Sequence, residues 1–249
     1  MGISFASDHA VQLWSVADCT SSLAALIFFL NGRQVQGLEL TPIPPIPRFR
    51  IPYTLAAMKQ HAESLVARLK DPSHWPGVGA VDHLQQLQEL AGEAKGRGTT
   101  DGYLAAMLII HQLTEEMIKI LIDDADFYTQ LKLYPLPLKP TRTKEKGTFG
   151  QYLADLKSTV WFQNKKYIVE KADRLNGIRN SIVHRLTKPD ALSVVEQNVT
   201  DAWELYSSLS FLALEAHMVF QSDFRDLYQN PDWPPKDTVI LRDDGSYLG

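Results

Sequence analysis

The chain has 249 residues, of which 45% are apolar and 22% are charged, a balance typical of an ordinary globular protein. The single cysteine, Cys19, excludes a disulfide framework and a cysteine metal cluster, and it fits a reducing compartment. The net charge of −4 is unevenly distributed along the chain, because residues 131–190 carry thirteen Lys and Arg against five Asp and Glu. This net charge of +8 predicts an anionic partner, with a solvated lysine-rich surface as the alternative.

Residues 1–53 form the first predicted unit, an N-terminal segment that packs on the rest of the chain. The apolar run Leu23–Leu30 is too short to cross a bilayer, and acidic rather than basic residues precede it. It therefore predicts core, and we expect a cytoplasmic protein without membrane association. Five prolines between Thr41 and Pro52 predict an extended or irregular backbone.

Residues 54–228 form the second predicted unit, a domain of amphipathic helices. Apolar residues recur there at three- and four-residue steps, which is the spacing of one buried helical face. The expected helices span about 54–69, 79–96, 101–128, 148–160, 165–186 and 191–228. No strand–helix alternation and no glycine-rich phosphate loop occurs, which argues against a Rossmann or P-loop fold. The expected fold is all-α, an up-and-down helical bundle.

The side chains expected in the core share this helical spacing, and all but one are apolar. They include Met58, Leu65, Leu69, Leu84, Leu87, Leu90, Ala91, Leu104, Met107, Leu108, His111, Ile118, Leu121, Ile122, Tyr152, Leu153, Leu156, Ile168, Ala172, Leu175, Ile182, Val195, Val199, Leu209 and Phe220. The exception, His111, is interpreted as a core or interface residue. Tyr103, Trp161 and Phe162 are candidates for stacking on bases, with a place in the core as the alternative.

Two stretches outside the helices are rich in proline. Residues 134–147 contain three prolines followed by basic side chains, which predicts a long basic loop of a length that is often functional. The last predicted unit is a C-terminal tail, residues 229–249, in which Thr238–Leu241 and the following Asp-Asp-Gly favour a small hairpin.

The most informative stretch is residues 175–184, Leu-Asn-Gly-Ile-Arg-Asn-Ser-Ile-Val-His, near the end of a predicted helix. Arg179 is followed directly by Asn180 and, five residues on, by His184. A planar guanidinium holds phosphate oxygens, and an imidazole exchanges protons near neutral pH. The alternative is structural, with Arg179 as a surface ion-pair donor and His184 as a cation favoured by the dipole at a helix C-terminus.

Other combinations of reactive residues carry less information. Arg68 and His74 have a similar spacing, but they straddle Asp71-Pro72, where a helix must break, and are interpreted as a coincidence. No His-Glu-x-x-His motif and no cysteine pair occurs. We therefore expect neither a metal site nor a cofactor.

The pattern Leu-Asn-x-Ile-Arg-Asn-x-x-Val-His resembles the signature of the HEPN (higher eukaryotes and prokaryotes nucleotide-binding) superfamily, specifically its Arg-x4-His ribonuclease type. The resemblance covers roughly residues 54–228, although its sequence-specific part is about ten residues long. It implies metal-independent cleavage of single-stranded RNA, in which the 2′-hydroxyl attacks the adjacent phosphate. Arg179 would then bind the scissile phosphate, His184 would be the acid–base residue and Asn180 would orient it. Such a nuclease would be a toxin or a defence effector, with an antitoxin or regulatory protein as partner.

Further residues acquire a role through the same resemblance. Some HEPN proteins carry an acidic residue four positions before a basic one on an earlier helix, and Glu115 with Lys119 matches that pattern, with an ordinary surface ion pair as the alternative. The side chains expected to contact the RNA backbone are Lys139, Arg142, Lys144, Lys146 and Arg185. One HEPN toxin subgroup has a tyrosine two residues after the histidine, where this chain has Leu186, which puts regulation through that tyrosine in doubt.

Helix geometry constrains how Arg179 and His184 can act together. Five residues at 3.6 per turn place them about 140° apart on an ideal helix. Either the helix unwinds near Val183, or two copies of the chain pool their residues. HEPN nucleases are understood to form such a composite site, so we expect a homodimer with paired Arg179 and His184.

Two rival interpretations remain open from the sequence. In the first, the chain is a non-catalytic HEPN-like module that binds RNA or a nucleotide or serves as a dimerising scaffold. Alternatively, it is a structural bundle in which Arg179 pairs with an acid of its own chain and neither Arg179 nor His184 faces a cleft.

Overall fold

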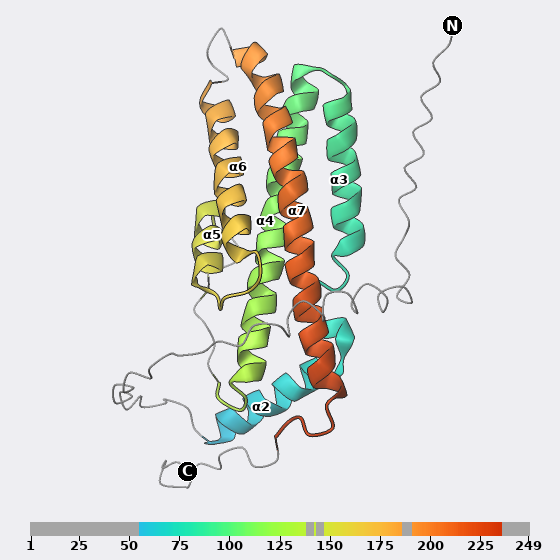
Figure 1. Ribbon diagram of the computed structural model, residues 1–249, viewed down its shortest axis with the longest axis vertical. Coiled ribbons are helices and arrows are strands. Elements are labelled where there is room, and N and C mark those ends of the chain that lie inside the picture. The colour runs from blue at the N-terminus through green and yellow to red at the C-terminus, as the bar shows by residue number, and fades with distance from the viewer. Residues whose placement is uncertain (1–54, 138–141, 143–146, 186–190, 236–249) are drawn as a thin grey trace, which may run out of the picture. The chain divides into compact units, whose positions relative to one another are not determined.

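The computed structural model describes residues 55–137, 142, 147–185 and 191–235, which all belong to one compact unit of the chain, residues 51–249 (Figure 1). Within these residues the secondary structure is entirely helical, with six α-helices and one short 3₁₀ helix. The all-α prediction is therefore confirmed. The N-terminal segment 1–53 and the predicted hairpin of the tail lie outside the described residues.

The helices match the six predicted from apolar periodicity, with ends that differ by a few residues. They are α2 (Leu55–Lys70), α3 (Val81–Gly96), α4 (Thr100–Lys132), α5 (Phe149–Ser158), α6 (Lys165–Arg185) and α7 (Ala191–Gln229). Helix α4 runs four residues beyond its predicted end at Tyr128, because Leu131 is still buried in the core.

A short 3₁₀ helix, η1 (Pro72–His74), was not predicted from the sequence. Asp71 caps it by accepting a hydrogen bond from the Ser73 amide at 3.1 Å, and Pro72 occupies its first turn. Arg68 Nε donates to the His74 carbonyl at 3.0 Å, and the Arg68 guanidinium lies 4.2 Å from the centre of the Phe127 ring. Arg68 and His74 thus have local structural roles.

Two clusters of buried side chains make up the core of this unit. The first cluster joins α2, α4, α5, α6 and α7 and includes Leu69, Ile118, Leu121, Phe127, Phe149, Leu156, Ile168, Leu209 and Phe224. The second cluster joins α3, α4, α6 and α7 and includes Ala91, Ala106, Ile110, Leu113, Leu175, Ile182, Val199 and Tyr206. Met117 packs against both. Helices α4 and α7 run through both clusters and form the centre of the arrangement in Figure 1.

The prediction of burial is wrong for two residues, since Leu108 is 59% exposed and Leu90 is 45% exposed. Ala106, Met107 and Ile110 of α4 belong to the second cluster, whereas Leu108 between them lies on the exposed side of the helix. The apolar periodicity identified the helix correctly, but it does not reveal which apolar positions a neighbouring helix covers. Phe162, in contrast, is buried against Phe220, so the alternative core position is the correct one for this aromatic residue.

A buried polar pair links α4 to α7. Asp124 has no exposed surface, and its carboxylate accepts a hydrogen bond from His217 Nδ1 at 2.7 Å. Burial raises the pKa of Asp124, and the bond from His217 opposes that rise. Gly77, with φ of +74°, lies directly against the His217 ring. This loop therefore needs a residue that has no side chain and tolerates the left-handed region.

Candidate functional site

Helix α6 carries the Arg179–His184 motif and stays helical through Arg185. The unwinding near Val183 that would bring the two side chains together within one chain is therefore not seen. Arg179 is half-buried, whereas His184 is exposed. The core face of α6, formed by Ile168, Ala172, Leu175 and Ile182, is buried as predicted.

Arg179 opens onto a cavity of about 420 Å³ between α4, α5 and α6. The residues that line it are His111, Glu115, Gly147, Thr148, Phe149, Gly150, Asn176, Arg179 and Asn180. One guanidinium nitrogen of Arg179, Nη1, donates to Asn180 Oδ1 at 3.1 Å. Its Nε is buried and has no partner among the described residues, and no described carboxylate forms an ion pair with it. Arg179 and Asn180 thus share a cavity, which His184 does not line.

His111 is the histidine that the structure places beside Arg179. It is half-buried, its Nε2 lies 3.4 Å from Asn176 Oδ1, and its ring centre lies 4.5 Å from that of Phe149. Burial lowers the pKa of His111, the contact with Asn176 opposes that shift, and the nearby charge of Arg179 adds to it. The net effect favours the neutral form of the imidazole.

Glu115 and Lys119 form an ion pair at 2.8 Å on α4, and Lys119 also bonds Glu116 at 3.0 Å. Burial lowers the pKa of Lys119, but the hydrogen bonds that it donates to both carboxylates outweigh that effect, so the pKa is raised overall. The pair has the geometry of the ordinary i,i+4 interaction. Glu115 nevertheless lines the cavity, so its carboxylate lies beside the candidate residues.

The N-terminus of α5 closes one side of the cavity. Thr148 and Gln151 form a reciprocal capping box, in which the Thr148 amide donates to Gln151 Oε1 at 2.7 Å. The cap explains why the helix begins at Phe149. A Cβ atom built on Gly150 would meet nothing within 4 Å, so the surface there is open.

Of the basic residues predicted to guide RNA, Arg142 is the one whose side chain the structure describes. Its guanidinium binds the Asp126 carboxylate, with Nε at 2.7 Å from Oδ2, and donates to the Ser158 hydroxyl at 2.6 Å. Arg142 therefore ties the loop to α4 and α5. Lys139, Lys144, Lys146 and the side chain of Arg185 lie outside the described residues, and Leu186 does as well.

The other two aromatic candidates lie at the surface of the bundle. Trp161 is 83% exposed in the turn between α5 and α6. Tyr103 donates its hydroxyl hydrogen bond to Glu196 at 3.1 Å. Trp161 is thus accessible for stacking, while the hydroxyl of Tyr103 has a partner in its own chain.

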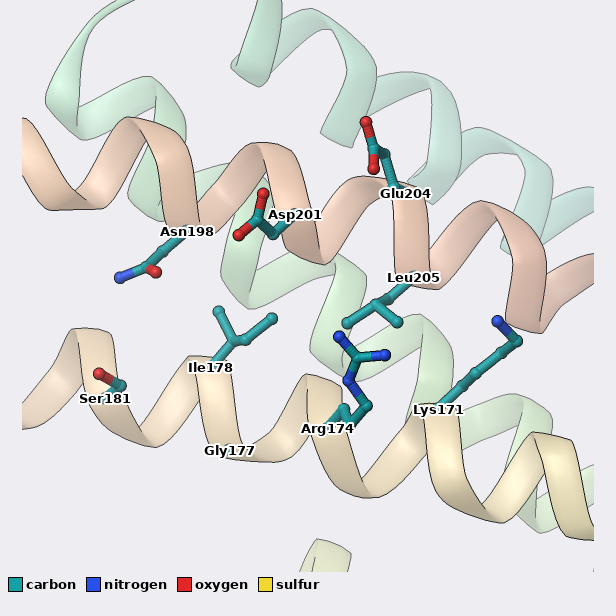
Figure 2. Close-up of a pocket in the computed structure, with 9 residues that line it drawn as sticks. All are labelled: Lys171, Arg174, Gly177, Ile178, Ser181, Asn198, Asp201, Glu204 and Leu205. Atoms are coloured by element: carbon teal, nitrogen blue, oxygen red, sulfur yellow. The ribbon is translucent and has the colours of Figure 1, made fainter.

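A larger cavity, of about 820 Å³, lies on the opposite side of α6, against α7. Figure 2 shows Lys171 and Arg174 on α6 across from Asp201 and Glu204 on α7. The wall carries charges of both signs and includes no histidine. We therefore regard the smaller cavity as the better candidate, although it has half the volume, because it joins a cation without an acidic partner to a neutral imidazole.

Sequence reasoning missed His111, Phe149 and Gly150 as members of the site, and it quoted Asn176 within the motif without giving it a role. His111 carried a signal, since a histidine among apolar positions is a polar group that needs a partner. Phe149 and Gly150 lie on an element whose approach to α4 is a property of the tertiary structure.

No protein-family profile, curated protein or solved structure matches this chain. In the parts of the chain that the structure describes, no group of three or more His, Cys, Asp and Glu is placed to hold a metal ion. None of the described helices has the length and apolar character that crossing a bilayer requires.

Proposed function

We propose that this chain is a metal-independent endoribonuclease of the HEPN type that cleaves single-stranded RNA and acts as a toxin or defence effector in the cytoplasm. The observation that carries the proposal is the position of Arg179. It is a half-buried guanidinium that lines an open cavity without an acidic partner among the described residues. A structural arginine in a helical bundle is normally paired, because an uncompensated charge away from bulk water costs free energy.

The chemistry requires no metal ion at any step. The guanidinium holds two phosphate oxygens and stabilises the charge that develops on them in the transition state. An imidazole takes the proton of the ribose 2′-hydroxyl, and the leaving 5′-oxygen receives a proton. Asn180, which binds Arg179 directly, fixes the orientation of the guanidinium rather than that of His184.

We further propose that His184 acts in a homodimer. It is exposed and lies five residues from Arg179 on a regular helix, so it needs a second chain to reach a phosphate bound by its partner's arginine. Val183, next to it, is 45% exposed, and Leu108 on α4 is 59% exposed. Exposed apolar side chains of this kind suit a surface that is buried against a second copy.

The test is cleavage of a fluorescent single-stranded RNA in EDTA by the wild type, Arg179→Ala and His184→Ala. Both variants should lose at least about a hundredfold in rate. Arg174→Ala is the matched control for the arginine, since Arg174 lies on the same helix but lines the opposite cavity. His83→Ala, on the exposed face of α3, is the control for the histidine. Equal rates in all five proteins would refute the proposal.

The alternative function is a non-catalytic module that binds RNA or a nucleotide. The observation that favours it is the absence of His184 from the cavity that contains Arg179. In that case RNA binds and the affinity falls in Arg179→Ala but not in His184→Ala, while no cleavage occurs in any variant.

A further inference from the structure

The cavity that contains Arg179 has the composition of a phosphate site. Arg179 provides one positive charge, and its buried Nε lacks a partner in the described residues. Glu115 is the carboxylate among the lining residues, and it is paired at 2.8 Å with Lys119, which also binds Glu116. Arg179 is the lining cation that has no carboxylate partner in the described part of the chain. The amides of Asn176 and Asn180 add hydrogen-bond donors on the same wall of α6.

The N-terminus of α5 adds a second element favourable to anions. Gly147, Thr148, Phe149 and Gly150 all line the cavity, so the first turn of a ten-residue helix borders it. The first backbone N–H groups of a helix have no intrahelical acceptor, and they carry the positive end of the helix dipole. With Arg179 on the facing helix, a phosphate in the cavity lies between two positive groups.

His111 extends from α4 into the same space. Its ring packs on Phe149 at the start of α5, and its Nε2 contacts Asn176 on α6, so it is held by both neighbouring elements. The titratable groups that face it are Arg179 from α6 and Glu115 from its own helix. The α5 residues at the cavity carry no titratable side chain. If His111 donates from Nε2 to Asn176, Nδ1 is left as a proton acceptor.

We propose that this cavity binds a phosphodiester within a single chain, with Arg179 and the start of α5 on the phosphate and His111 as the proton acceptor for the ribose 2′-hydroxyl. The identity of the ligand as a ribose-phosphate link rests on the proposed function. His111 takes the 2′-hydroxyl proton, the 2′-oxygen bonds to phosphorus and the bond from phosphorus to the 5′-oxygen breaks. The 5′-oxygen takes a proton from His184 of the partner subunit, which leaves a 2′,3′-cyclic phosphate and a 5′-hydroxyl.

The binding test uses uridine 3′-monophosphate and a pair of substitutions at Gly150. Gly150→Glu places a carboxylate in the first turn of α5, where space is open and the helix dipole favours an acid. Gly150→Gln is its neutral control. We expect Gly150→Glu to bind the nucleotide on the order of tenfold more weakly than Gly150→Gln, as like charges at close range predict. Equal affinities, or no binding by the wild type at millimolar nucleotide, would overturn the site.

A second measurement follows His111 itself by NMR, with its imidazole resonance assigned from the His111→Gln variant. Nucleotide binding should raise the pKa of His111, because a phosphate brings negative charge beside the ring. In the cleavage assay, His111→Gln should lose about a hundredfold or more in rate, while His83→Gln retains the wild-type rate. Nucleotide that binds without changing the pKa of His111 would refute its position beside the phosphate.

The failures of the two proposals are distinguishable. If the wild type cleaves RNA and His111→Gln cleaves equally fast, the inference about His111 is wrong and the nuclease assignment stands. If no variant cleaves RNA, but the nucleotide raises the pKa of His111 and this effect is lost in Arg179→Ala, the phosphate site stands and the chain is a binding module. If the wild type neither cleaves nor binds, both proposals are wrong.

Discussion

Substitution of Gly77 by alanine tests the close approach of this loop residue to His217 on α7. Gly77 has φ of +74°, and a Cβ atom there would lie 2.8 Å from His217 Cε1 and 3.0 Å from Ile120 Cγ2. The His217 ring cannot move aside freely, because its Nδ1 is bound to the buried Asp124 carboxylate at 2.7 Å. We therefore expect Gly77→Ala to destabilise the protein through two separate effects.

The size of each effect follows from the geometry. An L-residue in the left-handed region costs about 1–2 kcal/mol. Forcing a methyl group into a packed site costs about a further 1–3 kcal/mol. Gly77→Ala should thus lower the free energy of unfolding by about 2–5 kcal/mol. Gly79 provides the control, since its φ is +86° but a Cβ atom there meets nothing within 4 Å. Gly79→Ala should cost only the backbone part.

Urea denaturation followed by circular dichroism measures both free energies of unfolding. The difference between Gly77→Ala and Gly79→Ala should be about 1–3 kcal/mol, and it should shrink when His217 is also replaced by alanine. If the two glycine variants differ by less than about 0.5 kcal/mol, the loop does not press on His217 as described.

Two further predictions concern titratable side chains. The pKa of His111 is lowered in the folded state. An unperturbed histidine in the unfolded chain has a pKa of about 6.5, so below that pH the unfolded chain binds more protons than the folded chain does. The free energy of unfolding should therefore fall as the pH decreases below about 6.5, less so in His111→Gln, and identical pH profiles would contradict this expectation. Asp124→Ala should lower the free energy of unfolding by about 3–5 kcal/mol, since it removes a buried partner of His217. A loss below about 1 kcal/mol in urea denaturation would show that the pair contributes little.

The helices could be predicted from the sequence because their apolar faces repeat over several turns. Tyr152, Leu153 and Leu156 on α5 and Leu175 on α6 are buried as predicted. Periodicity reports that a face is buried but not what buries it. Leu108 therefore looked like a core residue, although its side chain is exposed.

The candidate site could be predicted only in part, for a related reason. The motif identified Arg179 and Asn180, which do line a cavity, and it placed His184 on the same helix. The neighbour of Arg179 turned out to be His111, 68 positions earlier in the chain. Contacts of such sequence separation depend on how α4 and α6 pack, and one sequence contains no direct record of that packing.

The arrangement of α4 and α7 has a consequence for cooperativity. Both helices supply buried side chains to each core cluster, and Met117 on α4 contacts the two clusters together. One end of the bundle cannot melt while the other persists unless a continuous helix breaks in its middle, where the backbone hydrogen bonds are best protected. Phe149, which lines the cavity, and Leu175, which precedes the lining residue Asn176, belong to different clusters. The cavity geometry is thus maintained by the global folding equilibrium and not by a local one.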